Sequence, residues 1–280
     1  MAISRTTYAL AGGLLLGALA AAPAMANTVT WNFGTIGANG GTVCAANCAL
    51  GTGVFGFTAG GNTLDLSAYS SVQYSQTIYQ DGHHHTVTYF RNYGPSDTKL
   101  TQKPGSGNET GIGAQAPKSA LGTAEINTNE AVLINASLLP TGSELTSLMI
   151  GSIQANEGFN VYGLSSLSSL SGFDGGIAAK AILPPNNANL PTGWNKVASY
   201  TNNNNNVSQQ EQVNLLFNNG VLPSYSYYLV TSSAADVVLE SAAATLGSGN
   251  VGVPEPASMA LMLVGVLGLG ALRFAGRSRA

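Results

Sequence analysis

Three consecutive histidines, His83, His84 and His85, are the residues whose type and spacing most clearly suggest chemistry. In a β-strand, successive side chains point to opposite faces, so His83 and His85 would share one face and His84 would occupy the other. Two imidazoles on one face, with Asp81 nearby, could bind zinc or copper if a third ligand came from elsewhere. A polar loop entering a strand explains the same residues without a metal. We therefore predict no metal and no cofactor, with His83 and His85 as the candidates if a metal does bind.

The sequence patterns of common enzymes are missing. There is no Gly-x-Ser-x-Gly elbow, no His-Glu-x-x-His pair, no phosphate-binding loop and no EF-hand loop. A glycosidase needs two positioned carboxyl groups, and folding could bring together distant acids such as Asp65, Glu157 or Asp174. The sequence has no tight acidic cluster, however, and Asp174-Gly175-Gly176 is typical of a turn. We predict a protein without catalytic residues, and a secreted carbohydrate-active enzyme is the alternative.

Tyrosines are a more promising sign of binding. A tyrosine ring can stack on the face of a sugar while its hydroxyl stays in water. The alternative for any one of them is a place in the apolar core. The candidates are Tyr74, Tyr79, Tyr89, Tyr93, Tyr225, Tyr227 and Tyr228.

Short runs of β-branched and aromatic residues, separated by Gly, Asn, Ser and Pro, predict an all-β fold. Asp81-Gly82 and Asn219-Gly220 are typical of tight hairpin turns. So many short strands, with no long helical period, predict a β-sandwich of jelly-roll type. The predicted strands are 29–33, 72–79, 86–90, 131–138, 145–150, 194–200, 212–217, 227–231 and 236–241.

Three segments do not fit this strand pattern. The residues 95–117 are rich in Gly, Ser, Lys and Thr, which predicts a long exposed loop. Leucines at positions 164, 167 and 170 repeat every three residues, which fits either a helical turn or an irregular loop. The asparagine run 202–206 predicts a polar hairpin loop between two strands.

The first 26 residues have the organisation of a secretory signal peptide. Arg5 precedes an apolar stretch from Tyr8 to Ala22, and Ala24-Met25-Ala26 supplies the small residues of a cleavage site before Asn27. We therefore expect export by the Sec machinery and a β-sandwich body covering 27–244. In an exported chain, Cys44 and Cys48 are predicted to form a small local disulfide, and half of a metal site is the alternative.

The charge of the body excludes one class of partner. Without the two terminal segments, six basic and twelve acidic residues remain, which gives 6 − 12 = −6. Because there is no basic patch, we expect no nucleic-acid partner. Charged residues make up only 8% of the chain, far below the roughly 25% of average proteins. A surface of neutral polar residues suits an environment of polysaccharide.

The last 28 residues, 253–280, follow a linker at 245–252 and have three parts. Val253-Pro254-Glu255-Pro256 comes first, and its prolines keep Glu255 on an extended segment. An apolar run, Ala257–Leu272, then predicts one transmembrane helix; its sixteen residues span about 24 Å, less than the roughly 30 Å of a bilayer core. Arg273, Arg277 and Arg279 form a basic end, which predicts that this end stays cytoplasmic and the body lies outside.

These three parts, in this order, resemble the PEP-CTERM sorting signal of bacterial exosortase substrates. The resemblance covers about a tenth of the chain, and an ordinary C-terminal membrane anchor is the alternative. It implies a Gram-negative host, recognition by a membrane-embedded exosortase near Pro254, removal of the tail, and delivery to the cell surface or the extracellular matrix. The function it implies is that of a non-enzymatic surface or matrix protein associated with exopolysaccharide or biofilm. A secreted carbohydrate-active enzyme, or a carbohydrate- or metal-binding module with the same signal, is the alternative.

Overall fold

The structure is a computed structural model of the chain that describes residues 27–107, 109–119, 124–170, 177–178, 192–203, 211–216 and 224–247. Contacts gather Thr28–Leu246 into one compact unit. In chain order, the elements are β1 (Asn27–Asn32), β2 (Cys48–Thr52), β3 (Val54–Ala59), β4 (Asn62–Gln80), β5 (His83–Tyr93), β6 (Lys99–Lys103), β7 (Gly111–Gln115), β8 (Glu130–Asn135), β9 (Glu144–Ile153), β10 (Gly158–Leu164), the 3₁₀ turn η1 (Leu167–Leu170), β11 (Ile177–Ala178), β12 (Trp194–Thr201), β13 (Glu211–Leu216), β14 (Tyr227–Ser232) and β15 (Val238–Leu246).

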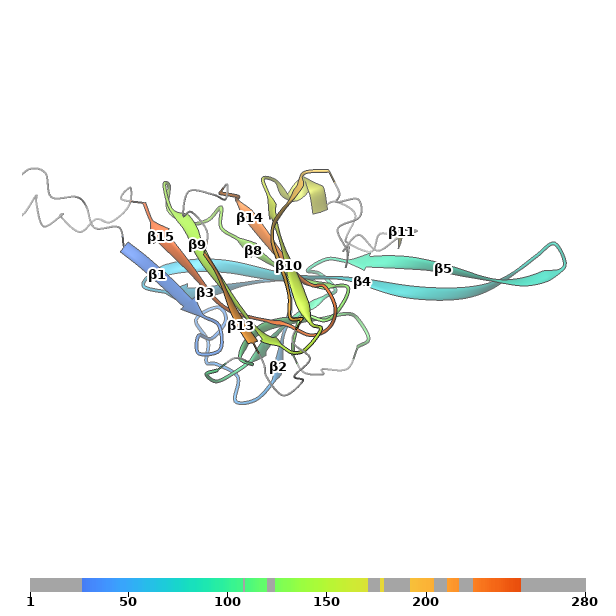
Figure 1. Cartoon of the computed structure of the whole chain (residues 1–280), viewed down its shortest axis with the longest axis horizontal. Helices are drawn as coiled ribbons and strands as arrows, with labels where there is room; N and C mark the ends of the chain where they lie inside the picture. Colours follow the sequence, from blue (N-terminus) through green and yellow to red (C-terminus); the bar gives the residue numbers. More distant parts are fainter. Residues whose placement is uncertain are drawn as a thin grey trace, which may run out of the picture. The chain divides into compact units, whose positions relative to one another are not determined.

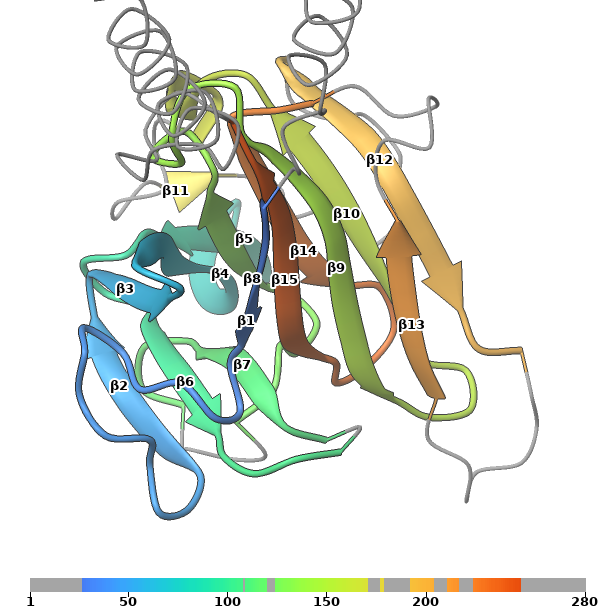
Figure 2. The same cartoon turned by 90° about the vertical axis from the view of Figure 1, so that its left-hand side faces the viewer.

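The strands form two antiparallel sheets (Figure 1). One sheet has the order β13-β9-β15-β7-β6-β2, with β1 also paired to β15. The other has the order β11-β5-β4-β8-β14-β10-β12, with β3 also paired to β4. One of the two sheets curls into a half-barrel (Figure 2). The prediction of an all-β fold is confirmed.

Side chains from both sheets meet in one apolar core. Trp31 and Phe33, from β1 and the turn after it, are completely buried there with Phe57 of β3. Phe33 and Phe57 meet edge to face, with ring centroids 5.2 Å apart, and the indole N–H of Trp31 donates to the carbonyl of Asn62 at 3.1 Å. β1 and the turn after it therefore supply two of the largest core residues, Trp31 and Phe33.

A second, smaller apolar cluster covers the opposite face of the β4–β8–β14–β10 region. It joins Leu170 of η1 and Trp194 of β12 to side chains of the sheet. With apolar layers on both faces, β8 and β10 are buried along almost their whole length. Two of the three leucines of the sequence triplet belong to this cluster, because Leu164 ends β10 and Leu170 ends η1, and both are buried in it. The middle one, Leu167, is 41% exposed.

Each predicted strand overlaps an observed strand, although the bounds differ. The predicted loop at 95–117 is wrong. Lys99–Lys103 forms β6 and Gly111–Gln115 forms β7, and the two strands pair with each other. The glycines that suggested a loop permit close packing instead: a Cβ on Gly111 would lie 2.2 Å from the carbonyl oxygen of Leu239, and one on Gly113 would lie 2.3 Å from that of Ala124. Gly in a strand marks such approaches of another backbone. The predicted turn at Asn219-Gly220 and most of the asparagine run lie outside the described residues.

Candidate functional site

A long hairpin of β4 and β5 extends beyond the body of the unit (Figure 1). The pairing of β4 with β8 ends at Ser70, whereas its pairing with β5 continues to Gln80, opposite His83. The two-residue turn Asp81–Gly82 has φ values of 52° and 78°. Positive φ at both positions matches a type I′ turn, whose twist fits the flanking strands and fixes their register. We call the paired segments 72–80 and 83–91 the arm.

One face of the arm continues the core side of the sheet. Leu66 and Ala68 of β4 point into the apolar core, so the even-numbered residues further along β4 share that side. The register pairs Ser70 with Tyr93 and so places the odd-numbered residues of β5 on the same side. We call this side the tyrosine face. Its residues on the arm are Val72, Tyr74, Gln76, Ile78 and Gln80 from β4, and His83, His85, Val87, Tyr89 and Arg91 from β5.

The aromatic residues at the base of the arm hold one another in place. Tyr74 and Tyr89 lie directly opposite each other, and their rings stack with centroids 5.6 Å apart and planes 15° apart. The hydroxyl groups of Tyr74 and Tyr93 are 2.8 Å apart, and burial, reinforced by this hydrogen bond, raises the pKa of Tyr93. The Arg91 guanidinium lies 5.2 Å from the centre of the Tyr93 ring. Tyr74 and Tyr89 remain partly exposed, so the cluster presents pre-arranged rings to solvent.

The other tyrosines have different environments. Tyr79 lies on the opposite face of the arm, is 69% exposed, and meets the ring of His84 edge-on. Tyr228 belongs to the core, and Tyr225 packs edge-on against it. Tyr227 packs against the smaller apolar cluster. Among the seven tyrosines singled out in the sequence, Tyr74 and Tyr89 are therefore the pair stacked on an accessible surface, and Tyr93, which supports Tyr74, is buried.

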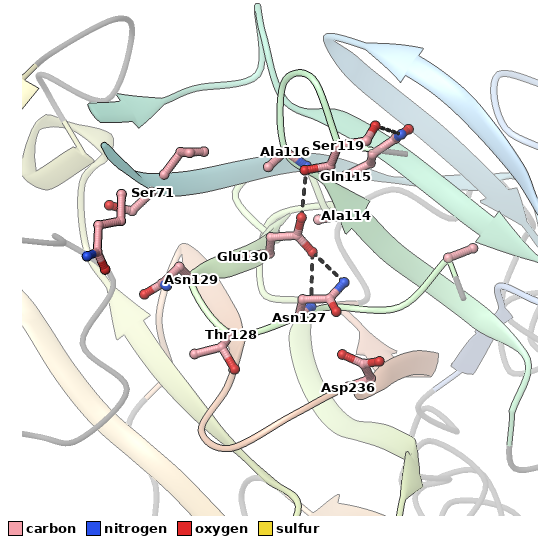
Figure 3. Close-up of a pocket in the computed structure, with 13 residues that line it drawn as sticks. Ser71, Ala114, Gln115, Ala116, Ser119, Asn127, Thr128, Asn129, Glu130 and Asp236 are labelled. Atoms are coloured by element: carbon pink, nitrogen blue, oxygen red, sulfur yellow. Dashed lines mark hydrogen bonds between the residues drawn. The ribbon is translucent and has the colours of Figure 1, made fainter. Parts of the chain in front are cut away.

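A hollow of about 500 Å³ lies next to the base of the arm (Figure 3). Its wall combines small apolar residues with amides, hydroxyls and two carboxyl groups. The lining residues are Ser71, Val72, Gln73, Ala114, Gln115, Ala116, Ser119, Ala124, Asn127, Thr128, Asn129, Glu130 and Asp236. Val72 and Gln73 immediately precede Tyr74, so the hollow and the tyrosine cluster are neighbours along β4.

Glu130 is fixed in the wall of this hollow by hydrogen bonds to both of its carboxyl oxygens (Figure 3). Oε1 accepts the backbone N–H of Ala116 at 2.8 Å. Oε2 accepts the backbone and the side-chain N–H groups of Asn127, each at 3.0 Å. Burial raises the pKa of Glu130, the charge of Asp236 adds to the rise, and the three hydrogen bonds oppose it. The carboxyl group therefore joins the turn at Asn127 to the end of β7.

The acids named in the sequence analysis do not line the hollow. Asp65 lies on β4 opposite Asn135, and Glu157 accepts the backbone N–H of Gln154 in the turn before β10. Asp174 lies outside the described residues. Sequence reasoning missed Glu130 and Asp236, because no local pattern connects two acids so far apart in the chain.

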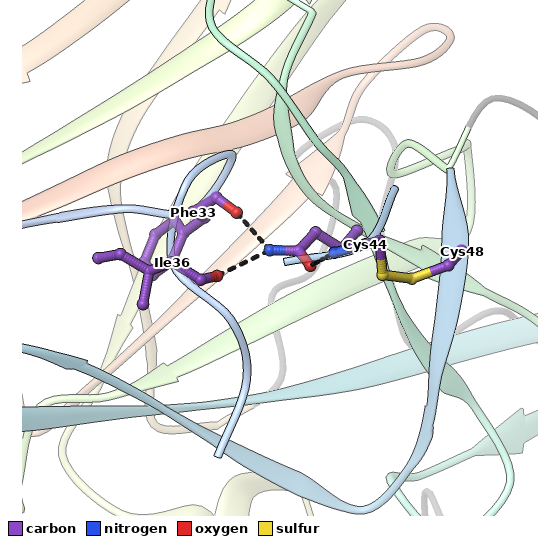
Figure 4. Close-up of a disulfide and its surroundings, with 5 residues drawn as sticks. Phe33, Ile36, Cys44 and Cys48 are labelled. Carbon is purple, nitrogen blue, oxygen red and sulfur yellow. Dashed lines mark hydrogen bonds between the residues drawn. A yellow bond between two sulfur atoms is a disulfide. The ribbon is translucent and has the colours of Figure 1, made fainter. Parts of the chain in front are cut away.

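Cys44 and Cys48 form a disulfide, as predicted (Figure 4). The loop before it is held by the buried side chain of Gln102 on β6. The Gln102 amide donates to the carbonyl oxygens of Phe33 and Ile36, at 2.7 and 2.8 Å, and its oxygen accepts the backbone N–H of Cys44 at 3.3 Å. The disulfide therefore belongs to a loop that is also attached to the core.

His83 and His85 lie on the tyrosine face near the tip of the arm, and both are exposed. In the described part of the chain, no group of three or more His, Cys, Asp or Glu side chains could hold a metal ion. The structure thus brings the two candidate ligands onto one face, with no third ligand of these types beside them in the described residues.

The residues of the two predicted targeting segments fall outside the described part of the chain, except Asn27, which begins β1. These are Ala24, Ala26, Val253, Pro254, Glu255, Pro256, Arg273, Arg277 and Arg279. Among the described residues, no helix has the length and apolar character needed to cross a membrane. In comparisons with known proteins, no family model matches the chain and no curated protein matches it.

Proposed function

We propose that this chain is a non-enzymatic exported protein of a Gram-negative cell surface or extracellular matrix that associates with exopolysaccharide. The Sec machinery exports the chain, and an exosortase then sorts and processes it near Pro254-Glu255-Pro256. The order of motif, apolar run and terminal arginines supports sorting, and the signal-peptide pattern at the other end supports export. The sparse charge of the body agrees with an environment of neutral polar material.

The tyrosine face is the observation that carries the binding part of this proposal. Aromatic rings that are already ordered lose little conformational entropy when a ligand stacks on them. Tyr74 and Tyr89 stack and Tyr93 is hydrogen-bonded to Tyr74, so the binding surface needs no rearrangement. Between Val72 and Phe90 the chain has one charged residue other than histidine, Asp81. A neutral or weakly acidic polymer can approach such a surface without charge repulsion.

Binding is tested by co-sedimentation of the protein with exopolysaccharide from its own host. Tyr74→Ala and Tyr89→Ala should each reduce the bound fraction severalfold, because each removes a ring of the stacked pair. Tyr79→Ala is the matched control, since it removes an exposed tyrosine from the opposite face of the same arm. Equal losses in the three variants, or no loss in any of them, would contradict the assignment to the tyrosine face.

Sorting is tested in the native host by mass spectrometry of the mature C-terminus. The expected mature protein lacks the segment 257–280, and replacing Pro254 and Pro256 with alanine should leave the protein in the membrane fraction with its tail attached. An intact tail on protein that has reached the surface would refute exosortase processing and favour an ordinary membrane anchor.

We further infer that the body is a β-sandwich of jelly-roll type. When β7, β8, β9, β10, β12, β13, β14 and β15 are numbered from one to eight, one sheet contains β7-β15-β9-β13, or strands one, eight, three and six. The other contains β8-β14-β10-β12, or strands two, seven, four and five. This is the order produced by wrapping two Greek keys into two facing sheets. The arm and the first strands are additions to that framework.

A glycosidase is the second candidate function, because Glu130 and Asp236 both line the hollow. Glycoside hydrolysis uses two carboxyl groups, one of which must be able to donate a proton. Both oxygens of Glu130 accept N–H groups, so a structural role is favoured. Release of reducing ends from host polysaccharide that is lost in both Glu130→Gln and Asp236→Asn would establish the enzyme instead.

A further inference from the structure

We propose that His83 and His85 form a binding site for a divalent transition-metal ion at the tip of the arm. The two imidazoles share one face only if residue 83 already belongs to a strand, which the sequence leaves open. In the structure, His83 is the first residue of β5 and lies opposite Gln80, and His85 lies opposite Ile78. The site goes beyond binding of polysaccharide and does not depend on it.

The geometry of the strand suits bidentate binding. Residues i and i+2 of a strand are about 7 Å apart at their Cα atoms and project side by side from one face. Two imidazole side chains at that spacing are long enough to converge on one ion, with each coordinating nitrogen about 2.0–2.1 Å from it. The Asp81–Gly82 turn fixes the register of this pair, so the two histidines are not independent loop residues.

The surroundings place no opposing charge beside an ion. Between Val72 and Phe90 there is no lysine or arginine, and the one carboxylate, Asp81 of the turn, lies two residues before His83; Arg91 lies at the other end of the arm. All three histidines are exposed. A metal ion can therefore reach the two imidazoles directly from solvent, and no neighbouring lysine or arginine repels it.

His84 is kept away from the pair. It projects from the opposite face, where its ring meets the ring of Tyr79 at a centroid distance of 5.2 Å and an angle of 68°. The chain therefore contains its own control: three adjacent histidines with equal chemistry, of which only two can act on one ion.

Two protein ligands leave open coordination positions, which water occupies. Copper(II) accepts nitrogen ligands together with water in a square arrangement, and it lies above nickel and zinc in the affinity order for such ligands. Calcium and magnesium prefer oxygen ligands. We therefore expect the order copper, then nickel and zinc, with no binding of calcium or magnesium at these residues.

The test is calorimetric titration of the full chain, produced without an affinity tag, with copper(II) and zinc(II) at neutral pH. His83→Ala and His85→Ala should each weaken the copper affinity by about tenfold or more, and His84→Ala should leave it within about twofold of the original. The substitutions are at exposed positions of the tip, and unchanged circular dichroism confirms that each variant is folded. Equal affinities in the three variants, or an equal loss in His84→Ala, would overturn the proposal.

Electron paramagnetic resonance of the copper-loaded chain gives an independent result. Hyperfine coupling to two imidazole nitrogens is expected, and only one should remain in His83→Gln or His85→Gln. A spectrum without imidazole coupling, or one unchanged by these substitutions, would also overturn it.

Discussion

Glu240 should make the folded protein less stable as the pH rises from weakly acidic to weakly alkaline. It lies in a β-bulge of β15, where the pairing with β9 passes from Leu239–Ile150 to Ser241–Met149. Its carboxyl Oε2 accepts a hydrogen bond from the Gln212 amide, whereas its Oε1 is buried and has no hydrogen-bond partner. Burial raises the pKa of Glu240 from its usual value of 4.5 to about 7, opposed in part by the Gln212 hydrogen bond.

The sign and the size follow from this pKa. The folded state holds the Glu240 proton more tightly than the unfolded chain, so stability is greatest below about pH 4.5 and declines until the pH exceeds about 7. Each pKa unit corresponds to about 1.4 kcal/mol, so the difference amounts to about 3 kcal/mol. For a domain of this size, that loss lowers the melting temperature by roughly 6–12 °C.

The assay is urea unfolding of the original protein and of Glu240→Gln at several pH values from about 4 to about 8, a range that covers the whole decline. The glutamine does not titrate, so the variant should lack about 3 kcal/mol of the decline. Comparing slopes rather than absolute stabilities removes the cost of burying the new amide, which is the same at every pH. Glu144→Gln removes an equal charge from the exposed start of β9 and is the control. Parallel curves for the original protein and Glu240→Gln would refute the reasoning, as would an equal change in the control.

Three further predictions concern stability, each measured by denaturant unfolding. Phe57→Ala should cost about 3–5 kcal/mol because it leaves a cavity beside Phe33, whereas Val54→Ala on the same strand should cost little, since Val54 is 57% exposed. Gly111→Ala should prevent β7 from pairing with β15 and so lose cooperative unfolding, because the new Cβ would overlap the Leu239 carbonyl; cooperative unfolding at the original midpoint would contradict this. Gln102→Leu should destabilise the protein more than replacing Cys44 and Cys48 with serine. The leucine leaves the Phe33 and Ile36 carbonyls and the Cys44 N–H without their hydrogen-bond partner, and each buried group left unpaired costs about 1–3 kcal/mol. The short disulfide loop contributes about 2 kcal/mol, and the reverse order would show that Gln102 is not the main attachment of that loop.

The strands that sequence reasoning found are those with period-two alternation or a run of β-branched residues, such as Val29–Asn32 and Thr86–Phe90. The strand Gly158–Leu164 was missed because it is buried on both faces and shows no alternation. The strand Gly111–Gln115 was missed because its glycines, which usually signal turns, serve here to admit neighbouring backbones. Close approaches between distant segments leave no local signal, so they cannot be recovered from one sequence.

The candidate site also has features that the sequence predicts and features that only the fold reveals. The shared face of His83 and His85 and the turn at Asp81–Gly82 could be predicted, because both are local properties of a hairpin. The stacking of Tyr74 on Tyr89 required the register between two strands. The meeting of Glu130 and Asp236 around one hollow required the whole topology.

The position of β15 constrains the order in which this chain can fold. The last strand lies in the interior of its sheet, between β9 and β7, and it also pairs with β1, the first strand. The Phe33 N–H donates to the Glu240 carbonyl across more than 200 residues of sequence. Contacts between such distant segments form slowly, and the core cannot close around Trp31 until the last strand has been made. A partly synthesised chain therefore lacks the central strand of this sheet, which would favour the unfolded form that the proposed export requires.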